Sequence, residues 1–173
     1  MRTRLPLLTA ALLIGPAWAD DKIDSAKVEE QARAVGKAFL AADWAKVVDA
    51  THPRAIELAG GKDKMIELVA AGMKKLTAQG FTFKEYKVGT AQAPVAGGKT
   101  VYVVVPTSLE IAGPGAKIVT DSYLLAISDD GGKTWTFADG AGLSDPAKRK
   151  TIFPDLPKEL KLPDRKPPVV TKD

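Results

Sequence analysis

Two side chains suited to acid–base chemistry stand two positions apart in the sequence, at Asp121 and Tyr123. The residues around them alternate as in a β-strand, which places both side chains on one face of a sheet. A carboxylate that removes a proton and a phenol that donates a hydrogen bond are the groups that an isomerase or a dehydratase needs. The sequence does not tell which face is concave. The alternative interpretation is that Asp121 is exposed to solvent or hydrogen-bonded to a neighbouring strand.

His52 is the only histidine in the chain, so a histidine-based metal site or a serine–histidine triad would depend on it alone. Imidazole has an ordinary pKa of about 6.5, which makes His52 a second candidate base. It also precedes Pro53, and the residue before a proline is pushed out of the helical region. The alternative interpretation is that His52 caps a helix or lies on the surface.

The composition excludes several kinds of site. The chain has no cysteine, which removes disulfides, thiolate zinc sites, cysteine nucleophiles and iron–sulfur clusters. The run Asp129-Asp130-Gly131-Gly132 lacks the alternating oxygen ligands and the terminal glutamate of a calcium loop. The formal net charge is +4, but the lysines are spread along the chain, so we expect no nucleic acid partner. We also expect neither a metal nor a cofactor.

The first 19 residues have the pattern of a cleavable signal peptide. Arg2 and Arg4 precede an apolar run over residues 5–14, and Ala17-Trp18-Ala19 supplies small residues for a signal peptidase. An apolar run of about ten residues is too short to span a bilayer, which takes about 20. We therefore predict cleavage after Ala19, a periplasmic or secreted location, and no membrane insertion of the mature chain.

The first half of the mature chain has helical periodicity. Asp24 and Ser25 can cap a helix over residues 25–42, whose apolar residues recur at helical spacing. Asp43 can cap a short second helix that carries Trp44 and ends at His52-Pro53. A third helix is predicted over residues 62–79.

The second half has a period of two and predicts four strands, over residues 81–88, 100–111, 117–128 and 133–139. The apolar phase of the first strand slips between Phe83 and Tyr86, which indicates a bulge. Short turns join successive strands, so the sheet must be antiparallel. The predicted fold is α+β, with three N-terminal helices packed on a curved four-stranded antiparallel sheet.

The chain then divides into a domain over residues 20–143 and a tail over residues 144–173 that is rich in proline and lysine. We expect apolar residues early in the tail to pack back onto the domain, and disorder beyond Pro163. The residues expected to pack back are Ile152, Phe153, Leu156, Leu160 and Leu162.

This order of elements resembles the nuclear transport factor 2-like, or SnoaL-like, cone. The run Phe39-Leu40-Ala41-Ala42-Asp43-Trp44 looks like the end of that family's first helix and the start of its second. The run Gly61-Lys62-Asp63-Lys64-Met65-Ile66 looks like the start of its third helix, and Trp135 falls in the last strand, where an aromatic residue is common. The resemblance covers about residues 24–142.

The resemblance implies an apolar pocket inside the cone, with Trp44, Tyr86 and Tyr102 as the candidate ligand-binding residues. Relatives of this kind include isomerases, dehydratases and epoxide hydrolases, and also non-catalytic binding or assembly domains. Our first hypothesis is non-catalytic binding of a small apolar molecule or a protein partner. The alternative is an enzyme that uses Asp121 or His52 as its base. The resemblance also implies homodimers that form through the exposed sheet face.

A second, local resemblance lies at residues 128–135. The run Ser128-Asp129-Asp130-Gly131-Gly132-Lys133-Thr134-Trp135 matches S-x-D-x-G-x-T-W, the Asp-box found on hairpins of sialidase-like propellers. Ser128 and Asp130 can bond turn amides, and the glycines accept positive φ. We therefore predict a hairpin clamp without catalytic function.

Overall fold

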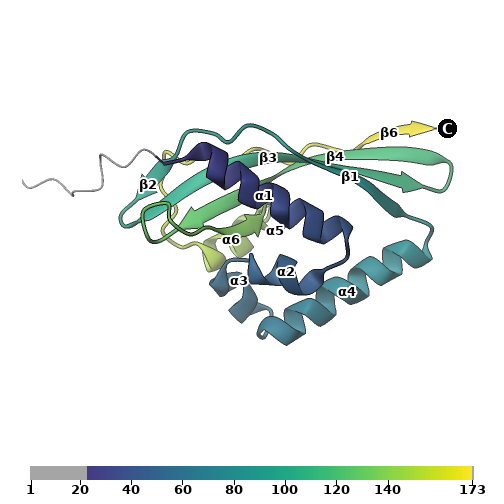
Figure 1. The fold of residues 1–173 in the computed structure, drawn as a ribbon, viewed down its shortest axis with the longest axis horizontal. Coiled ribbons are helices and arrows are strands. Elements are labelled where there is room, and N and C mark those ends of the chain that lie inside the picture. The colour runs from purple at the N-terminus through teal and green to yellow at the C-terminus, as the bar shows by residue number, and fades with distance from the viewer. Residues whose placement is uncertain (1–22, 173) are drawn as a thin grey trace, which may run out of the picture.

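The structure, a computed structural model, describes residues 23–172. The predicted signal peptide lies outside the described residues. Helices precede a twisted antiparallel sheet, so the chain has the predicted α+β fold (Figure 1). The helices ahead of the sheet are α1 (Ser25–Leu40), α2 (Trp44–Asp49), α3 (Pro53–Leu58) and α4 (Lys62–Ala78).

The third of these helices, α3, was not predicted, so the described part of the chain has four helices ahead of the sheet rather than three. Proline is well tolerated at the first position of a helix, where its missing N–H has no partner to lose. His52 caps this turn, because its Nδ1 accepts the backbone N–H of Arg54 at 3.3 Å. The sequence His52-Pro53 therefore starts a helix as well as ending the segment before it.

Six strands form the described sheet, where four were predicted. The strand order is β1-β3-β4-β5, with β2 paired to β3 and β6 paired to β4. The predicted bulge is confirmed, since the pairing of β1 with β3 shifts register between Phe83 and Glu85. The strands are β1 (Thr82–Val88), β2 (Val95–Gly97), β3 (Thr100–Gly113), β4 (Ala116–Ser128), β5 (Thr136–Asp139) and β6 (Val169–Lys172).

Both faces of the sheet are covered by apolar packing. The helix-facing core joins α1 to the sheet through Val28, Ala32, Val103, Val105, Leu124, Ala126, Trp135 and Phe137. The opposite, tail-facing core contains Tyr102, Val104, Tyr123, Leu125, Ile127, Ala138, Leu143 and Phe153. The tail therefore covers part of the sheet face that the resemblance implied for dimers, and homodimerisation stays a prediction.

The tail is more ordered than its composition predicts. A short helix, α5 (Gly140–Leu143), ends the preceding domain, and the tail begins with a second short helix, α6 (Pro146–Ile152). Ile152, Leu156, Leu160 and Leu162 then pack on the tail-facing core, as expected. Beyond Pro163, where we expected disorder, β6 pairs with residues 116–119 of β4. The edge of β4 extends past β5 and leaves backbone groups that this segment satisfies.

The Asp-box hairpin is the predicted clamp. The buried Ser128 hydroxyl accepts the backbone N–H of Gly132 at 2.8 Å. The Asp130 carboxylate accepts hydrogen bonds from the Thr134 hydroxyl and from two turn amides. The Thr134 hydroxyl bond is the largest cause of a lowered Asp130 pKa. Trp135 closes the hairpin by donating its indole N–H to the Gly132 carbonyl at 3.1 Å.

A close contact between α1 and β1 sets the position of Tyr86. A β-carbon built at Gly36 would clash with the Tyr86 ring, so only glycine allows the ring to lie against the helix. Gly72, in the middle of α4, has open space around the same position. The two helical glycines therefore offer a matched pair for testing this packing.

We predict that Gly72→Ala raises the free energy of unfolding by about 0.5–1 kcal/mol, the usual gain from replacing glycine inside a helix. Gly36→Ala has the same helical gain but must displace Tyr86, so we expect it to lower the free energy of unfolding. Urea denaturation of both variants measures the difference. A Gly36→Ala variant as stable as Gly72→Ala would contradict the packing described here.

Candidate ligand-binding cavity

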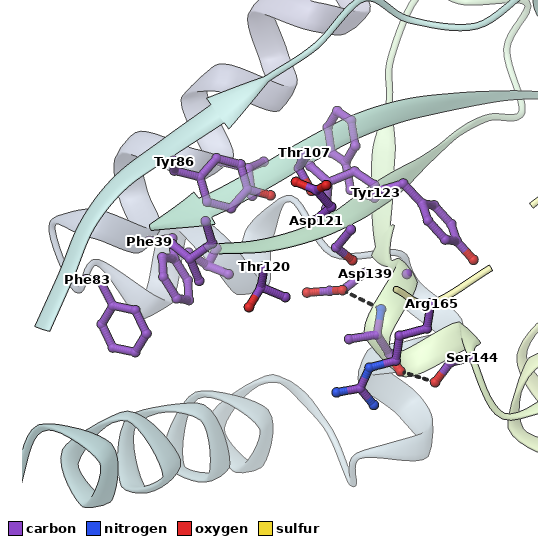
Figure 2. A pocket seen from close by; sticks show the side chains of 18 of the residues that line it. Phe39, Phe83, Tyr86, Thr107, Thr120, Asp121, Tyr123, Asp139, Ser144 and Arg165 are labelled. Carbon is purple, nitrogen blue, oxygen red and sulfur yellow. Dashed lines mark hydrogen bonds between the residues drawn. The ribbon is translucent and has the colours of Figure 1, made fainter. Parts of the chain in front are cut away.

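A cavity of about 490 Å³ lies between the helices and the sheet. This volume falls within the range of small-molecule sites, roughly 300–1,000 Å³. Most of its wall is apolar, and polar side chains such as Thr107 and Asp139 also line it (Figure 2). The apolar wall includes Val35, Phe39, Val47, Met73, Leu76, Phe83, Leu109, Ile111, Leu124 and Phe137.

The cavity exists because α4 stands away from the sheet. No residue of α4 is buried, and the helix packs mainly against α2 and α3. Its inner side still contributes Met73 and Leu76 to the cavity wall. On the sheet side the wall follows alternation along β3, where Thr107, Leu109 and Ile111 face the helices. The space between these two surfaces is therefore lined but not filled.

The bulge in β1 completes the aromatic part of the wall. Phe83 and Tyr86 are three positions apart, a spacing that puts two residues on opposite faces of a regular strand. The register shift between them brings both into the cavity lining. The Phe39 ring of α1 lies 5.2 Å from the Phe83 ring, edge-on, and 6.1 Å from the Tyr86 ring.

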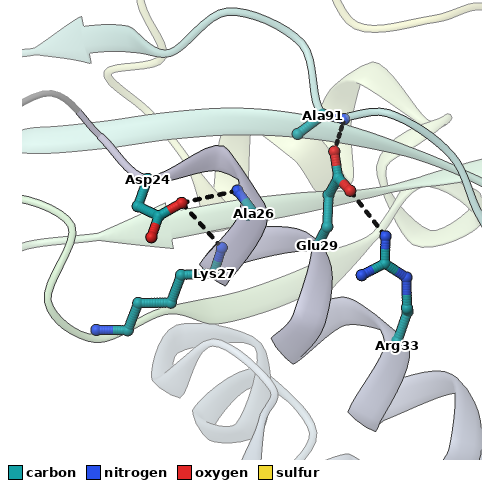
Figure 3. A network of polar contacts seen from close by, with 6 residues as sticks. All are labelled: Asp24, Ala26, Lys27, Glu29, Arg33 and Ala91. Atoms are coloured by element: carbon teal, nitrogen blue, oxygen red, sulfur yellow. Dashed lines mark hydrogen bonds and ion pairs between the residues drawn. The ribbon is translucent and has the colours of Figure 1, made fainter.

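The wall helix α1 is anchored at its N-terminal half by polar contacts (Figure 3). Asp24 caps it by accepting the amides of Ala26 and Lys27. Glu29 accepts the backbone N–H of Ala91 at 3.0 Å and pairs with Arg33 at 2.8 Å. These contacts tie the helix to the loop after β1, so the first half of α1 has a fixed position relative to the sheet.

Asp139 is the acidic group at the polar end of the cavity. It ends β5 opposite Leu124, on the same face as Phe137, and so points toward the helices. Its carboxylate accepts one backbone N–H, that of Ala141, at 2.7 Å (Figure 2). Burial among protein atoms raises its pKa, and the Ala141 bond acts in the opposite direction. The side chain nevertheless remains accessible from the open cavity, so a ligand can reach it.

Tyr86 faces the same end of the cavity from β1. Burial raises the pKa of Tyr86 to about 12, against a smaller opposite effect of the Thr107 hydroxyl. The negative charge of Asp139 raises the Tyr86 pKa further. At neutral pH Tyr86 is therefore an uncharged phenol that can donate or accept a hydrogen bond.

The structure does not bring Asp121 and Tyr123 into the cavity as an acid–base pair. They share a face of β4, as alternation predicts, but it is the face turned away from the helices. Tyr123 packs in the tail-facing core, and the side chains of Thr120 and Ser122 occupy the helix-facing positions instead. Asp121 and Tyr123 border the cavity only along the edge of β4.

His52 does not line the cavity. Its ring lies 5.0 Å from the Phe153 ring, on the side of the tail, and burial lowers its pKa. Its Nδ1 already accepts the Arg54 amide. The structure therefore supports the capping interpretation and places this candidate base outside the cavity.

Of the three predicted ligand-binding aromatics, Tyr86 alone lines the cavity. Trp44 packs edge-on against Phe39, with ring centroids 5.7 Å apart, and borders a shallow groove between α2 and α4. Tyr102 is buried in the tail-facing core near Phe153.

Sequence analysis missed Asp139, although a signal for it exists. Asp139 follows Phe137 at strand spacing, and the next residues, Gly140-Ala141-Gly142, break the strand. An aspartate in this position is a typical helix cap. Its place in the cavity also depends on which face of β5 the helices cover, and the local sequence does not specify this.

The described residues contain no group of three or more metal-ligating side chains, and none of their helices is long and apolar enough to cross a membrane. Comparisons of the chain with protein-family models, with curated proteins and with solved structures return no match. The family resemblance therefore stays a prediction, and the cavity itself carries the functional argument.

We predict that Asp139→Asn stabilises the protein more at pH 7 than at pH 3. The raised pKa means that the folded state binds more protons than the unfolded state above pH 3.8, so stability falls as pH rises through this window. Asparagine avoids this loss, and its amide oxygen can still accept the Ala141 N–H. Thermal melts of both proteins across pH measure the effect, with the difference at pH 3 as the internal control. A pH-independent difference would contradict the raised pKa of this carboxyl group.

Proposed function

We propose that the chain is an exported protein that binds a small, largely apolar molecule in the cavity between its helices and sheet. The observation that carries this proposal is the cavity of about 490 Å³, whose wall is mostly apolar. Sites for small molecules typically combine such a wall with a few polar groups that orient the ligand. A concave, enclosed wall favours a small molecule over the protein partner that we also considered.

The polar groups are placed to orient one end of such a ligand. Tyr86, Thr107, Ser122 and Asp139 come from four different strands and lie at the same part of the lining. None of these side chains is a buried polar group without a hydrogen-bond partner. The site can therefore exist without its ligand and still offer donors and acceptors to it.

Export is supported by the first 19 residues, which combine two arginines, an apolar run and a small-residue cleavage pattern. We propose removal of this segment after Ala19 and a periplasmic or secreted location. Binding of a small apolar molecule needs no cysteine, and the chain contains none.

A second candidate function is acid–base catalysis of the isomerase, dehydratase or hydrolase type. The feature that favours it is the Asp139 carboxyl group, whose pKa burial raises, in the same cavity lining as the neutral phenol of Tyr86. In this version Asp139 takes the role of base that the sequence assigned to Asp121 or His52. The two functions differ in outcome: a binding protein releases its ligand unchanged, whereas an enzyme converts it.

To test the binding site we predict the effect of Leu109→Trp, which fills the cavity from β3. The probe is the uncharged fluorophore N-phenyl-1-naphthylamine, whose emission rises in apolar surroundings. We expect the unmodified protein to bind it, and Leu109→Trp to weaken binding by at least about tenfold, a loss of about 1.4 kcal/mol.

The matched control is Leu68→Trp, because Leu68 lies on α4 with 54% of its surface exposed and does not line the cavity. Circular dichroism shows whether both variants are folded. Binding that is unchanged in a folded Leu109→Trp variant, or absent from the unmodified protein, would contradict the proposed site.

A further inference from the structure

The charge of the cavity is opposite to that of the chain. The whole sequence carries a formal net charge of +4. The cavity lining, by contrast, contains three acidic residues, Asp121, Asp139 and Asp164, and one basic residue, Arg165. Low-dielectric walls concentrate the field of such charges inside a cleft. The lining therefore favours positively charged molecules over negatively charged ones.

Asp139 is the acid that points into the cavity. It continues the helix-facing side of β5 after Phe137, whereas Asp121 belongs to the opposite face of β4 and Asp164 to the exposed tail. Asp139 receives one backbone N–H and takes part in none of the ion pairs found among the described residues. The side chain is accessible from the open cavity, so a ligand can reach the carboxylate. A cation at this position would gain a charge-assisted hydrogen bond to a carboxylate that forms no ion pair among the described residues.

Aromatic rings line the same cavity as Asp139. Phe137 precedes Asp139 on the same face of β5, and Tyr86 lines the cavity from β1. Phe39 adds a ring beside Tyr86, at a centroid distance of 6.1 Å. The faces of aromatic rings attract organic cations, by about 0.5–2 kcal/mol per contact. A carboxylate among aromatic rings matches an amine better than a neutral alcohol.

The other charged groups at this end of the cavity do not make its net charge positive. Arg165 comes from the segment between Leu162 and β6, and its side chain is exposed to solvent. Solvent screens its charge, as it does that of Asp139, whose side chain is also accessible from the open cavity. Asp164, beside Arg165, adds a negative charge at the same opening. The remaining polar side chains of the lining, among them Tyr86, Thr107, Ser122 and Ser144, are uncharged.

We propose that the ligand is an organic cation, an apolar molecule that carries one protonated amine and places it against Asp139. The inference rests on the proposed function, since it names the chemical class that the same cavity selects. The apolar body of the molecule lies against the wall of Phe83, Leu109 and Met73. Asp139 then determines specificity, because it distinguishes the amine from neutral and anionic molecules of equal size.

The test compares three probes that share one apolar body: 4-phenylbutylamine, 4-phenylbutan-1-ol and 4-phenylbutanoate. Isothermal titration of the full chain at pH 7 measures the three affinities. We expect the amine to bind at least about tenfold more tightly than the alcohol, and the carboxylate most weakly. Asp139→Asn should weaken the amine more than the alcohol and so reduce the difference between them to less than about twofold.

Asp155→Asn is the matched control, because Asp155 is exposed on the tail and does not line the cavity. It should keep the preference for the amine. An alcohol that binds as tightly as the amine would overturn the inference and leave the proposed function standing. Tightest binding of 4-phenylbutanoate would indicate that Arg165 binds the polar end of the ligand, and it would also overturn the inference. If none of the three probes binds, the inference fails, and the neutral fluorophore decides whether the cavity binds ligands at all.

Discussion

The register between β3 and β4 is the constraint on which the rest of the structure depends. The two strands pair without interruption from Val101 and Ser128 to Gly113 and Ala116. Because side chains alternate, a shift of one residue would exchange the two faces of a strand. The actual register directs Tyr123 and Leu125 to the tail and Thr120, Ser122 and Leu124 to the helices. The register thereby determines which polar groups line the cavity and can contact a ligand.

A sheet covered on both faces leaves space for a cavity only where the covering helices lie away from it. Near Val28 and Ala32, α1 lies directly on the sheet and the interior is filled. Farther along, α4 packs on α2 and α3 and the space beneath it stays open. Asp139 stands at the end of β5 in this open part. Burial raises its pKa, and shifted pKa values are common at functional positions.

Sequence reasoning predicted those features that local patterns determine. The caps at Asp24 and Asp43, the β1 bulge and the Asp-box clamp all depend on contacts within a few residues. Alternation also showed that Asp121 and Tyr123 share a face, but the choice of face depends on which side the helices pack. That choice, like the pairing of β6 with β4, arises from contacts between distant segments. Asp139 was missed for the same reason.

Native mass spectrometry of the chain, purified gently from a bacterium that exports it, tests the central claim most directly. A denaturing spectrum of the same sample gives the mass of the bare chain and shows whether residues 1–19 have been removed. The account predicts additional mass under native conditions, of the size of a small molecule, that disappears on denaturation. A native mass equal to that of the bare chain, both as purified and after incubation with a cell extract, would contradict it.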